Sequence, residues 1–277
     1  ISAYDPDIFY IFNFPEWPQC VKTLNNAFFD KRIVLDIKTP LLIEGDRRNH
    51  IQLKAQKFQE HVDIILTLSS ESVATWIPEC TRPVYEYPLG IDLSLFPHPS
   101  TFWQRSDLKK FTYIGSLHPK RKITQCIDYF RASAEQVQTP LQLDVYGRGA
   151  DAEQLRNISG SKEKFAQIRY QGLLPQQDLI SRLAAYDAGI AWVPVETYSH
   201  SPSLKALEYM AAGLPVLASN TRAHRLLAEQ ADTLYLFDNT PDSFAKALQE
   251  LRTAGFSKKS LLKNRQAVEA FDYERII

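Results

Sequence analysis

The chain has 277 residues, of which 44% are apolar and 23% are charged, a composition typical of a globular protein with a packed core. Its 32 basic residues equal its 32 acidic ones. This zero net charge argues against nucleic acid as the main partner, because nucleic-acid phosphates select basic surfaces. The length suffices for two modest α/β domains.

The cysteines and the apolar runs bear on where the protein works. Cys20, Cys80 and Cys126 are widely spaced and form neither a disulfide framework nor a zinc pattern, which predicts a reducing, cytoplasmic setting. No apolar run is long enough to span a membrane, and no signal peptide is visible. The chain starts at Ile1 and stops within the helix-like stretch 271–277, so we expect both ends to be cuts and the first domain to be incomplete.

The first part of the chain predicts strands and helices in alternation, the pattern of a parallel sheet covered by helices. Buried strands are predicted at 7–14, 31–37 and 62–69, and helices at 50–61 and 71–77. An extended, proline-punctuated segment at 84–99 is typical of an interdomain linker. We therefore divide the chain into a partial N-terminal domain at 1–90, a linker at 91–108 and a second domain at 109–277.

The second domain predicts a longer series of the same kind. Strands are expected at 111–116, 141–147, 168–173, 188–194, 214–219 and 233–237, with helices at 123–134, 152–158, 175–186, 203–212, 222–230 and 243–252. Six strands with intervening helices make a complete doubly wound domain, in which ligands bind at the carboxyl ends of the strands. The loops that follow strand ends are 115–122, 147–151, 172–175 and 198–204.

The segment 198–219 contains the most informative helix start. Ser201 is a suitable N-cap, Pro202 suits the first helical position, and Gly213 suits the end of the helix. Free N–H groups around Ser203 and Leu204 would then point out of the helix start, where the helix dipole favours an anion. This arrangement predicts a phosphate site.

Two charged side chains accompany that helix start. Lys205 lies beside the free N–H groups, and Glu208 lies five residues beyond Ser203, roughly 7.5 Å along the helix axis. That separation matches the distance from the phosphates of a nucleotide to its ribose hydroxyls, which a carboxylate can accept from. The alternative is a helix that carries a Lys205–Glu208 ion pair on its surface.

Other loops offer further candidates. Gly115 precedes a basic triplet that ends in Arg121 and Lys122, so the backbone could approach a diphosphate that the cations neutralise; a solvated basic turn is the alternative. Gly147-Arg148-Gly149 comes close to a dinucleotide-binding fingerprint, but a tight turn fits better because no acidic residue ends the next strand.

Metal and histidine signals are weaker. Asp5-Pro6-Asp7 matches a short acidic metal motif, yet it merely precedes a strand. No histidine pair has metal-ligand spacing. Among the histidines, which are mostly surface or capping residues, His200 is kept as a site candidate because it comes immediately before the predicted phosphate helix.

Together these motifs resemble the retaining nucleotide-sugar glycosyltransferases of the GT-B fold, family four (group 1). The resemblance covers the whole second domain, with motifs at 113–123, 143–149, 170–194 and 201–219, and the segment 87–96 is similar to the family's linker. It implies two Rossmann-like doubly wound domains that face each other across a cleft, the N-terminal one being incomplete here.

The resemblance also implies roles for individual residues. Arg121, Lys205 and His200 fall at catalytic positions. The residues implied to contact the donor nucleotide are Gly115, Ser116, Lys122, Gly147, Gly172, Leu173, Leu174, Ser203, Leu204 and Glu208. Within this set, the loop 172–174 would face the base and Glu208 would bind the ribose.

Two positions depart from the family pattern. Ser116 stands where the family usually has an arginine after the first glycine. His200 stands where the family has the first glutamate of a pair with seven residues between, the second being Glu208, while Glu196 is near but out of register. These departures affect the surroundings of the leaving group and of the transferred sugar.

The function that follows is a hexosyltransferase that moves a sugar from a UDP-, GDP- or ADP-sugar to a glycan or glycolipid, as in polysaccharide biosynthesis. It would retain the anomeric configuration and need no cofactor or metal. Regions outside this chain would be needed for activity or for peripheral association with the inner face of a membrane. The alternatives are a non-catalytic nucleotide-sugar binding module, a GT-B-fold sugar-nucleotide epimerase and, last, an NAD-dependent enzyme.

Overall fold

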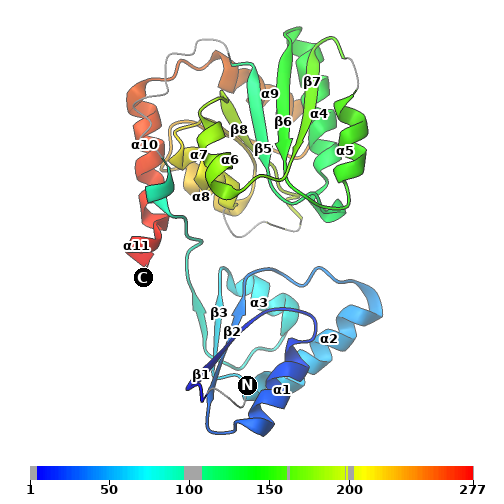
Figure 1. The fold of residues 1–277 in the computed structure, drawn as a ribbon, viewed down its shortest axis with the longest axis vertical. Coiled ribbons are helices and arrows are strands. Elements are labelled where there is room, and N and C mark those ends of the chain that lie inside the picture. Colours follow the sequence, from blue (N-terminus) through cyan, green and yellow to red (C-terminus); the bar gives the residue numbers. More distant parts are fainter. Residues whose placement is uncertain (1–4, 97–107, 161–162, 197, 199–202, 277) are drawn as a thin grey trace. The chain divides into compact units, whose positions relative to one another are not determined.

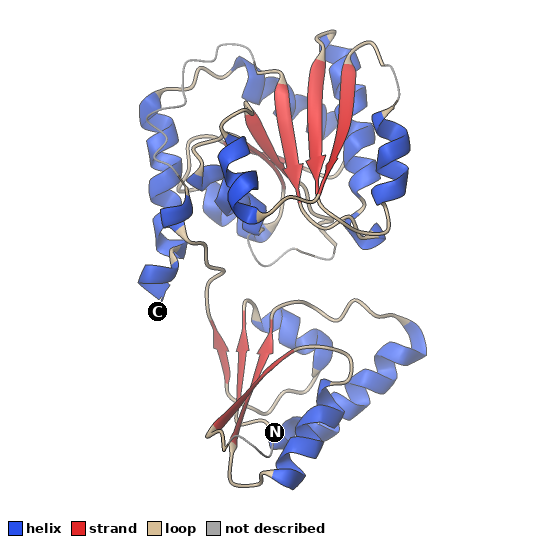
Figure 2. Cartoon of the chain, in the orientation of Figure 1, coloured by secondary structure: helices blue, strands red, loops and turns tan. Residues whose placement is uncertain are grey.

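A computed structural model of the chain describes residues 5–96, 108–160, 163–196, 198 and 203–276 (Figures 1 and 2). These residues separate into two compact units, 1–89 and 90–277. Each unit contains one parallel β-sheet with helices between its strands, as the sequence pattern predicts. The two units are described in turn.

The first unit contains a four-stranded sheet whose order in space is the order in the chain, β1-β2-β3-β4. All neighbouring strands are parallel. The strands are β1 (Ile8–Phe12), β2 (Arg32–Ile37), β3 (Ile64–Thr67) and β4 (Val84–Glu86), and the helices are α1 (Trp17–Ala27), α2 (Gly45–Phe58) and α3 (Ser70–Trp76), with a 3₁₀ turn, η1, at Gln59–His61.

One face of this sheet carries the core of the unit. Leu35 and Ile65 are fully buried there, together with Trp17 and Val21 of α1. On β1 the residues that alternate with buried Ile11 face the other way, and Tyr10 and Phe12 are 50% and 56% exposed. The first sheet therefore buries one face more completely than the other.

Sequence reasoning missed some elements of the first unit. Helix α1 was not predicted, and it carries a proline, a residue that breaks helix interiors. In the structure Pro18 lies in the first helical turn, where its missing N–H costs nothing. Helix α2 begins at Gly45, five residues before the predicted start, and the predicted linker segment begins with strand β4.

The second unit contains a six-stranded parallel sheet in the order β10-β9-β8-β5-β6-β7. This is the doubly wound order, and all six predicted strands are present. Their bounds are β5 (Lys110–Ile114), β6 (Leu141–Tyr146), β7 (Ala166–Gly172), β8 (Ala188–Ala191), β9 (Val216–Ser219) and β10 (Leu234–Phe237). The strand order reverses between β5 and β8, so the crevice expected to bind a ligand lies where the loops after these two strands meet.

Helices cover both faces of the second sheet (Figure 1). They are α4 (Ile123–Val137), α5 (Ala152–Ser159), α6 (Gln176–Leu183), α7 (Leu204–Ala211), α8 (Arg222–Ala228), α9 (Pro241–Thr253), α10 (Lys258–Val268) and α11 (Tyr273–Ile276), with 3₁₀ turns η2 (Leu93–Leu95), η4 (Pro119–Arg121) and η5 (Glu269–Phe271). On one face, Phe130 of α4 and Phe244 of α9 pack on Phe111 and Phe237. On the other, the ring of Tyr209 on α7 lies against Gly189, where a Cβ atom would come within 2.2 Å of it.

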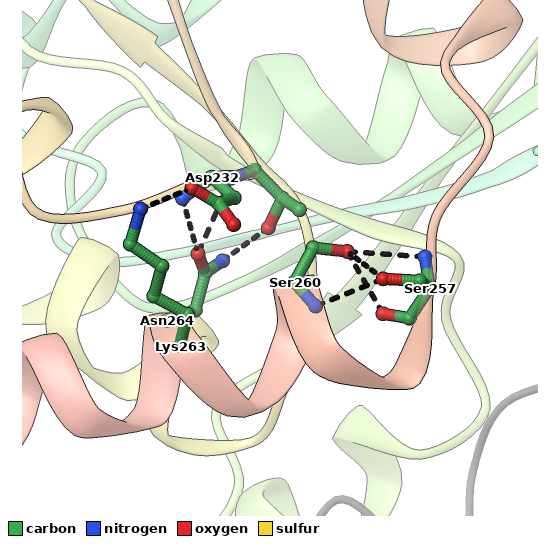
Figure 3. A network of polar contacts seen from close by, with 6 residues as sticks. Asp232, Ser257, Ser260, Lys263 and Asn264 are labelled. Carbon is green, nitrogen blue, oxygen red and sulfur yellow. Dashed lines mark hydrogen bonds and ion pairs between the residues drawn. The ribbon is translucent and has the colours of Figure 1, made fainter.

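Helix α10, which was not predicted, is attached to the start of β10 by a polar network (Figure 3). The buried Asn264 accepts hydrogen bonds from the N–H groups of Asp232 (3.1 Å) and Thr233 (3.2 Å), and donates one to the Thr233 hydroxyl. Lys263 pairs with the Asp232 carboxylate at 2.5 Å. At the helix start, Ser257 and Ser260 form a capping box.

Helix α10 also contacts residues 90–96, the start of the second unit. The Arg265 guanidinium donates to Leu93 O (3.2 Å) and Phe96 O (3.1 Å), and also to Ala211 O at the end of α7 (2.6 Å). Gly90 lies so close to the Tyr273 ring that a Cβ atom there would come within 2.2 Å. The described part of the predicted linker thus packs against the C-terminal helices; residues 97–107 lie outside the described residues.

Candidate functional site

Three of the four predicted loops are joined by backbone hydrogen bonds at the carboxyl edge of the second sheet. Gly115 N–H donates to Tyr146 O at 3.0 Å, and Leu117 N–H donates to Arg148 O at 2.9 Å. Gly147 N–H donates in turn to Gly172 O at 2.8 Å. The loops after β5, β6 and β7 therefore form one continuous rim.

The glycines of the Gly-x-Gly sequence make this close contact possible. A Cβ atom on Gly147 would lie 1.8 Å from Gly115 O, and one on Gly149 would lie 2.3 Å from the Leu117 carbonyl carbon. Both glycines have positive φ values, +146° and +156°. Packing between loops, as expected for the tight-turn interpretation, accounts for this motif without a dinucleotide.

The rim encloses a cavity of about 320 Å³ beside the carboxyl ends of β5 and β6. Its lining is mostly apolar, with backbone groups of the glycine loops and one cationic side chain. The lining residues are Ile114, Gly115, Ser116, Tyr146, Gly147, Arg148, Leu173, Leu174 and Leu179. The nucleotide-contacting residues predicted in the loops after β5, β6 and β7 thus surround a single cavity, apart from Gly172, which is bonded to Gly147, and Lys122.

Helix α7 begins at Leu204, with Ser203 as its N-cap residue. The predicted N-cap Ser201 and first helical residue Pro202 were therefore two residues too early, and both lie outside the described residues, as does the candidate His200. The Ser203 side chain makes no capping hydrogen bond to the helix. Leu204 and Lys205 are the first two residues of the first helical turn, so their N–H groups have no acceptor within the helix.

Lys205 is 9% exposed, so it does not lie on the surface as the ion-pair alternative required. Its ammonium nitrogen lies 5.4 Å from the centroid of the Tyr113 ring, and a Cβ atom on Gly115 would come within 3.4 Å of the Lys205 Cε. Burial lowers the pKa of Lys205 to about 7, and the charge of Arg121 adds to that lowering, whereas Glu208 opposes it. The lysine is a buried cation directly beneath the Gly115 loop.

Glu208 lies one turn further along α7. Burial raises the pKa of its carboxyl to about 7, against the opposing influence of the Lys205 charge. Although these two side chains influence each other, the described residues contain no ion pair between them. An anion that approached the helix start would therefore meet a lysine without a directly bonded counter-ion.

The loop after β8 meets the basic loop after β5 at the switch point of the sheet. Trp192, fully buried, donates its indole N–H to Arg121 O at 2.8 Å. The Arg121 guanidinium lies 3.9 Å from the centroid of the Tyr198 ring. These contacts hold Arg121 at the junction of the two loops.

The remaining cations of the basic loop are held differently. Lys122 adopts a left-handed conformation with φ +49°, which turns the chain into α4, and its ammonium lies 3.8 Å from the carboxylate of Glu196. His118 accepts a hydrogen bond from Lys120 N–H at 3.2 Å and so caps the turn η4, as expected of a capping histidine. Ser116 is exposed on the rim.

His224 is a residue of this region that sequence reasoning missed. It is fully buried on α8, and its Nε2 atom lies 3.1 Å from the Ser203 hydroxyl and 3.3 Å from Ser203 N. A signal was present in the sequence. Thr221 caps the helix that follows β9, which puts His224 in the first turn at the carboxyl edge, beside the strand that leads to α7.

The weak metal motif does not gain support. Asp5 pairs with Lys31 at 2.8 Å, and the backbone oxygen of Asp7 accepts a hydrogen bond from Arg32 N–H. Within the described residues no group of three or more His, Cys, Asp or Glu side chains is arranged to hold a metal ion. No helix in the described part of the chain has the length and apolar character that crossing a membrane requires.

Comparisons with known proteins identify a family for this chain. The family of glycosyl transferases group 1 matches residues 102–267, more than half of the chain. No curated protein matches the sequence.

Similar structures include sucrose-phosphate synthase from Thermosynechococcus elongatus (18% identity, TM-score 0.76, covering 99% of this chain and 72% of that one). Another is an E. coli protein described as "Trehalose-6-phosphate … bound with UDP-2-fluoro glucose" (12%, 0.72, 98% and 70%). A third is TarM from S. aureus in complex with Fondaparinux, alpha-GlcNAc-glycerol and UDP (13%, 0.70, 96% and 53%). The predicted α/β fold of the GT-B class is thereby confirmed.

Proposed function

The chain belongs to the family of glycosyl transferases group 1, and from that membership we propose that it transfers a sugar from a nucleotide-sugar donor to a glycan or glycolipid acceptor. The proposal includes the finer assignments, namely family four, a hexosyl group, retention of the anomeric configuration and independence of metal. One observation carries the proposal. The start of α7, the buried Lys205 and Arg121, which is stacked on Tyr198, lie together at the switch point of the second sheet.

The proposed chemistry is electrostatic. When the bond between the sugar and the diphosphate breaks, negative charge develops on the departing diphosphate. Lys205, Arg121 and the free N–H groups of Leu204 and Lys205 would stabilise that charge from fixed positions, with little reorganisation at the moment of reaction. These cations support the proposal that no metal is needed for the leaving group.

The other parts of the donor nucleotide, its ribose and its base, would lie on either side of the diphosphate site. We propose that Glu208 accepts hydrogen bonds from the ribose hydroxyls. The cavity beside Leu173, Leu174 and Gly115 would receive the base, since Gly115 lines this cavity and also lies against the Lys205 side chain. Structures similar to this one are described with UDP or a UDP-sugar, which makes UDP the first nucleotide to test.

The setting of the protein is also a proposal. Cys20, Cys80 and Cys126 are all free thiols, which supports a reducing, cytoplasmic environment. Peripheral association with the inner face of a membrane stays a prediction.

Binding followed by turnover tests the proposed function. Calorimetry with UDP, GDP and ADP should give saturable binding of at least one nucleotide, and the full-length protein should release that diphosphate from the corresponding sugar donor. NMR of the product should show the anomeric configuration of the donor. Failure of all three nucleotides to bind would overturn the donor site.

The same experiment separates the alternatives. Binding without transfer or hydrolysis by the full-length protein would favour a non-catalytic nucleotide-sugar binding module. Interconversion of two sugar nucleotides without an acceptor would favour an epimerase. Tight NAD binding that added UDP or GDP does not affect would favour an NAD-dependent enzyme.

A further inference from the structure

The hydrogen bonds of His224 define which of its nitrogens carries the proton. The Nδ1 atom lies 2.8 Å from Ser219 O, which can only accept, so Nδ1 must donate. Burial lowers the pKa of His224 to about 4, and the charge of Lys205 acts in the same direction, against the hydrogen bond to Ser219 O. At neutral pH the ring is therefore uncharged, and Nε2 offers a lone pair.

That lone pair faces the residue that begins α7. Nε2 lies 3.1 Å from Ser203 Oγ and 3.3 Å from Ser203 N, so both the hydroxyl and the backbone N–H of Ser203 are directed at it as donors. A serine in the N-cap position normally uses its oxygen to accept from the free N–H groups of the first helical turn. Here that side-chain bond is not made.

The consequence is that the helix start stays open to an external acceptor. With Ser203 held by His224, the N–H groups of Leu204 and Lys205 keep their hydrogen-bonding capacity next to the buried Lys205 ammonium. If Ser203 were released, its hydroxyl could rotate to accept from the N–H of Lys205, the second helical residue, and would compete with a ligand for it.

We propose that His224 is a positioning residue of the diphosphate site. It holds Ser203 by its Nε2 lone pair, keeps the N-cap hydroxyl away from the first turn of α7, and so reserves the N–H of Lys205, next to that of Leu204, for the phosphates of the donor. This inference rests on the proposed function, because it assumes that the diphosphate binds at the start of α7.

Two amide substitutions test the two sides of the ring separately. His224→Gln places an amide oxygen near the position of Nε2 and can still accept from Ser203. His224→Asn places its amide near Nδ1 and keeps only the bond to Ser219 O. Thr240→Ala, which removes the N-cap of α9, is a matched control because it weakens a helix on the other face of the sheet.

Affinity for UDP, GDP and ADP should be measured by calorimetry beside urea unfolding of each variant. We expect His224→Asn to weaken the nucleotide that wild type binds by about fivefold, the scale of one ordinary hydrogen bond, and His224→Gln to restore most of that loss. Thr240→Ala should lose stability but not affinity. Equal affinity losses in the two His224 variants, or losses that follow stability across all three variants, would overturn the inference while leaving the proposed function intact.

The wild-type protein provides a test that needs no variant and no ligand. The ¹⁵N shifts of the His224 ring should show a protonated Nδ1 and an unprotonated Nε2 at pH 7; a protonated Nε2 would overturn the inference. If wild type binds none of the three nucleotides, the proposed function fails and the inference fails with it.

Discussion

Two cationic regions meet at the switch point of the second sheet, and they hold their charges in opposite ways. At the start of α7, Lys205 is buried against the Gly115 loop, and no carboxylate in the described part of the chain forms an ion pair with it. In the loop after β5, the side chain of Lys122 is 52% exposed and already paired with Glu196, while Arg121 is intermediate and stacked on Tyr198. A buried charge is costly to keep and interacts strongly, whereas an exposed charge is screened by water.

This difference ranks the cations by their expected contribution to ligand binding. Lys205 should contribute most and also cost the most stability, Arg121 should come second, and Lys122 should contribute least. The ranking does not follow sequence position, because Arg121 and Lys122 are neighbours in the chain and yet differ in burial and in what their side chains contact. Substituting each cation in turn and measuring ligand affinity therefore tests this ranking.

Replacing Lys205 by methionine should have the largest effect. We expect Lys205→Met to lower turnover, and the affinity for the nucleoside diphosphate, by about tenfold to a thousandfold, the scale on which one preorganised donor acts. The same substitution should raise the free energy of unfolding at pH 7 by up to a few kcal/mol, because one unit of pKa shift corresponds to about 1.4 kcal/mol and burial disfavours the charged lysine. Calorimetry and urea unfolding measure the two effects.

Lys246→Met is the matched control, since the Lys246 side chain is 80% exposed on α9 and pairs with the exposed Glu250. It should change neither affinity nor stability measurably. A Lys205→Met variant that binds UDP, GDP or ADP as wild type does would show that the buried lysine is not part of the diphosphate site.

Arg121→Ala should have the second-largest effect, a loss of affinity and turnover of about tenfold, at the lower end of the same scale. Because the charge of Arg121 helps to lower the pKa of Lys205, its removal should also move the alkaline decline of binding to higher pH. Arg121→Lys retains the charge and loses most of the stacking on Tyr198; it should bind at an intermediate level. An alanine variant with unchanged turnover would remove Arg121 from the site.

The pH dependence of nucleotide binding should come from the buried groups of α7, Lys205 and Glu208, and not from the exposed Lys122. A bound diphosphate favours charged Lys205, so affinity is full below the free-state pKa of about 7 and falls as the pH rises through it. Ribose hydroxyls favour ionised Glu208, so affinity is full above the free-state pKa of about 7 and falls as the pH decreases through it. The two effects together predict a maximum near pH 7 with a decline of roughly fivefold on each side, measured by calorimetry from pH 5.5 to 9.

Variants assign the two sides of this profile. Lys205→Arg keeps its charge and should lose the alkaline decline, and Glu208→Gln should lose the acidic one. The terminal phosphate of UDP also loses a proton at about pH 6, but this affects wild type and both variants equally. A profile that neither substitution alters would mean that these two groups do not titrate in the binding step.

The sequence predicted the second sheet more completely than the surroundings of Lys205. All six strands of that sheet carry apolar runs bounded by turn residues, and their order follows from the doubly wound pattern. Helices α1 and α10 were missed because their local sequence signals are ambiguous. A proline stands in the first turn of α1. The buried face of α10 includes the polar Asn264, whose partners Asp232 and Thr233 are some thirty positions away in the chain. Contacts of this range cannot be seen in a local pattern.

Prediction of the candidate site from the sequence was limited in the same way. The glycine loops, Lys205 and Glu208 could be predicted because their spacing along one strand end or one helix carries the signal. The burial of Lys205 and the bond between Ser203 and His224 depend on how α7 and α8 pack beside each other after separate strands. The N-cap of α7 was misplaced by two residues, since Ser201 and Ser203 are both residues that suit an N-cap and tertiary contacts of Ser203 select between them.

Substitution of Lys122 should have the smallest effect on binding, and it gives the clearest contrast between an exposed and a buried cation. Its ion pair with Glu196 is long, 3.8 Å, and both side chains are more than half exposed, so the pair should contribute little to stability. We expect Lys122→Ala to weaken binding of the diphosphate by about twofold and Glu196→Gln to strengthen it slightly, since the released lysine can then face the ligand. Raising the salt concentration to 0.5 M should abolish both effects while most of the Lys205→Met effect persists, because screening acts on exposed charges. A Lys122→Ala loss as large and as salt-resistant as that of Lys205→Met would mean that burial does not distinguish the two regions.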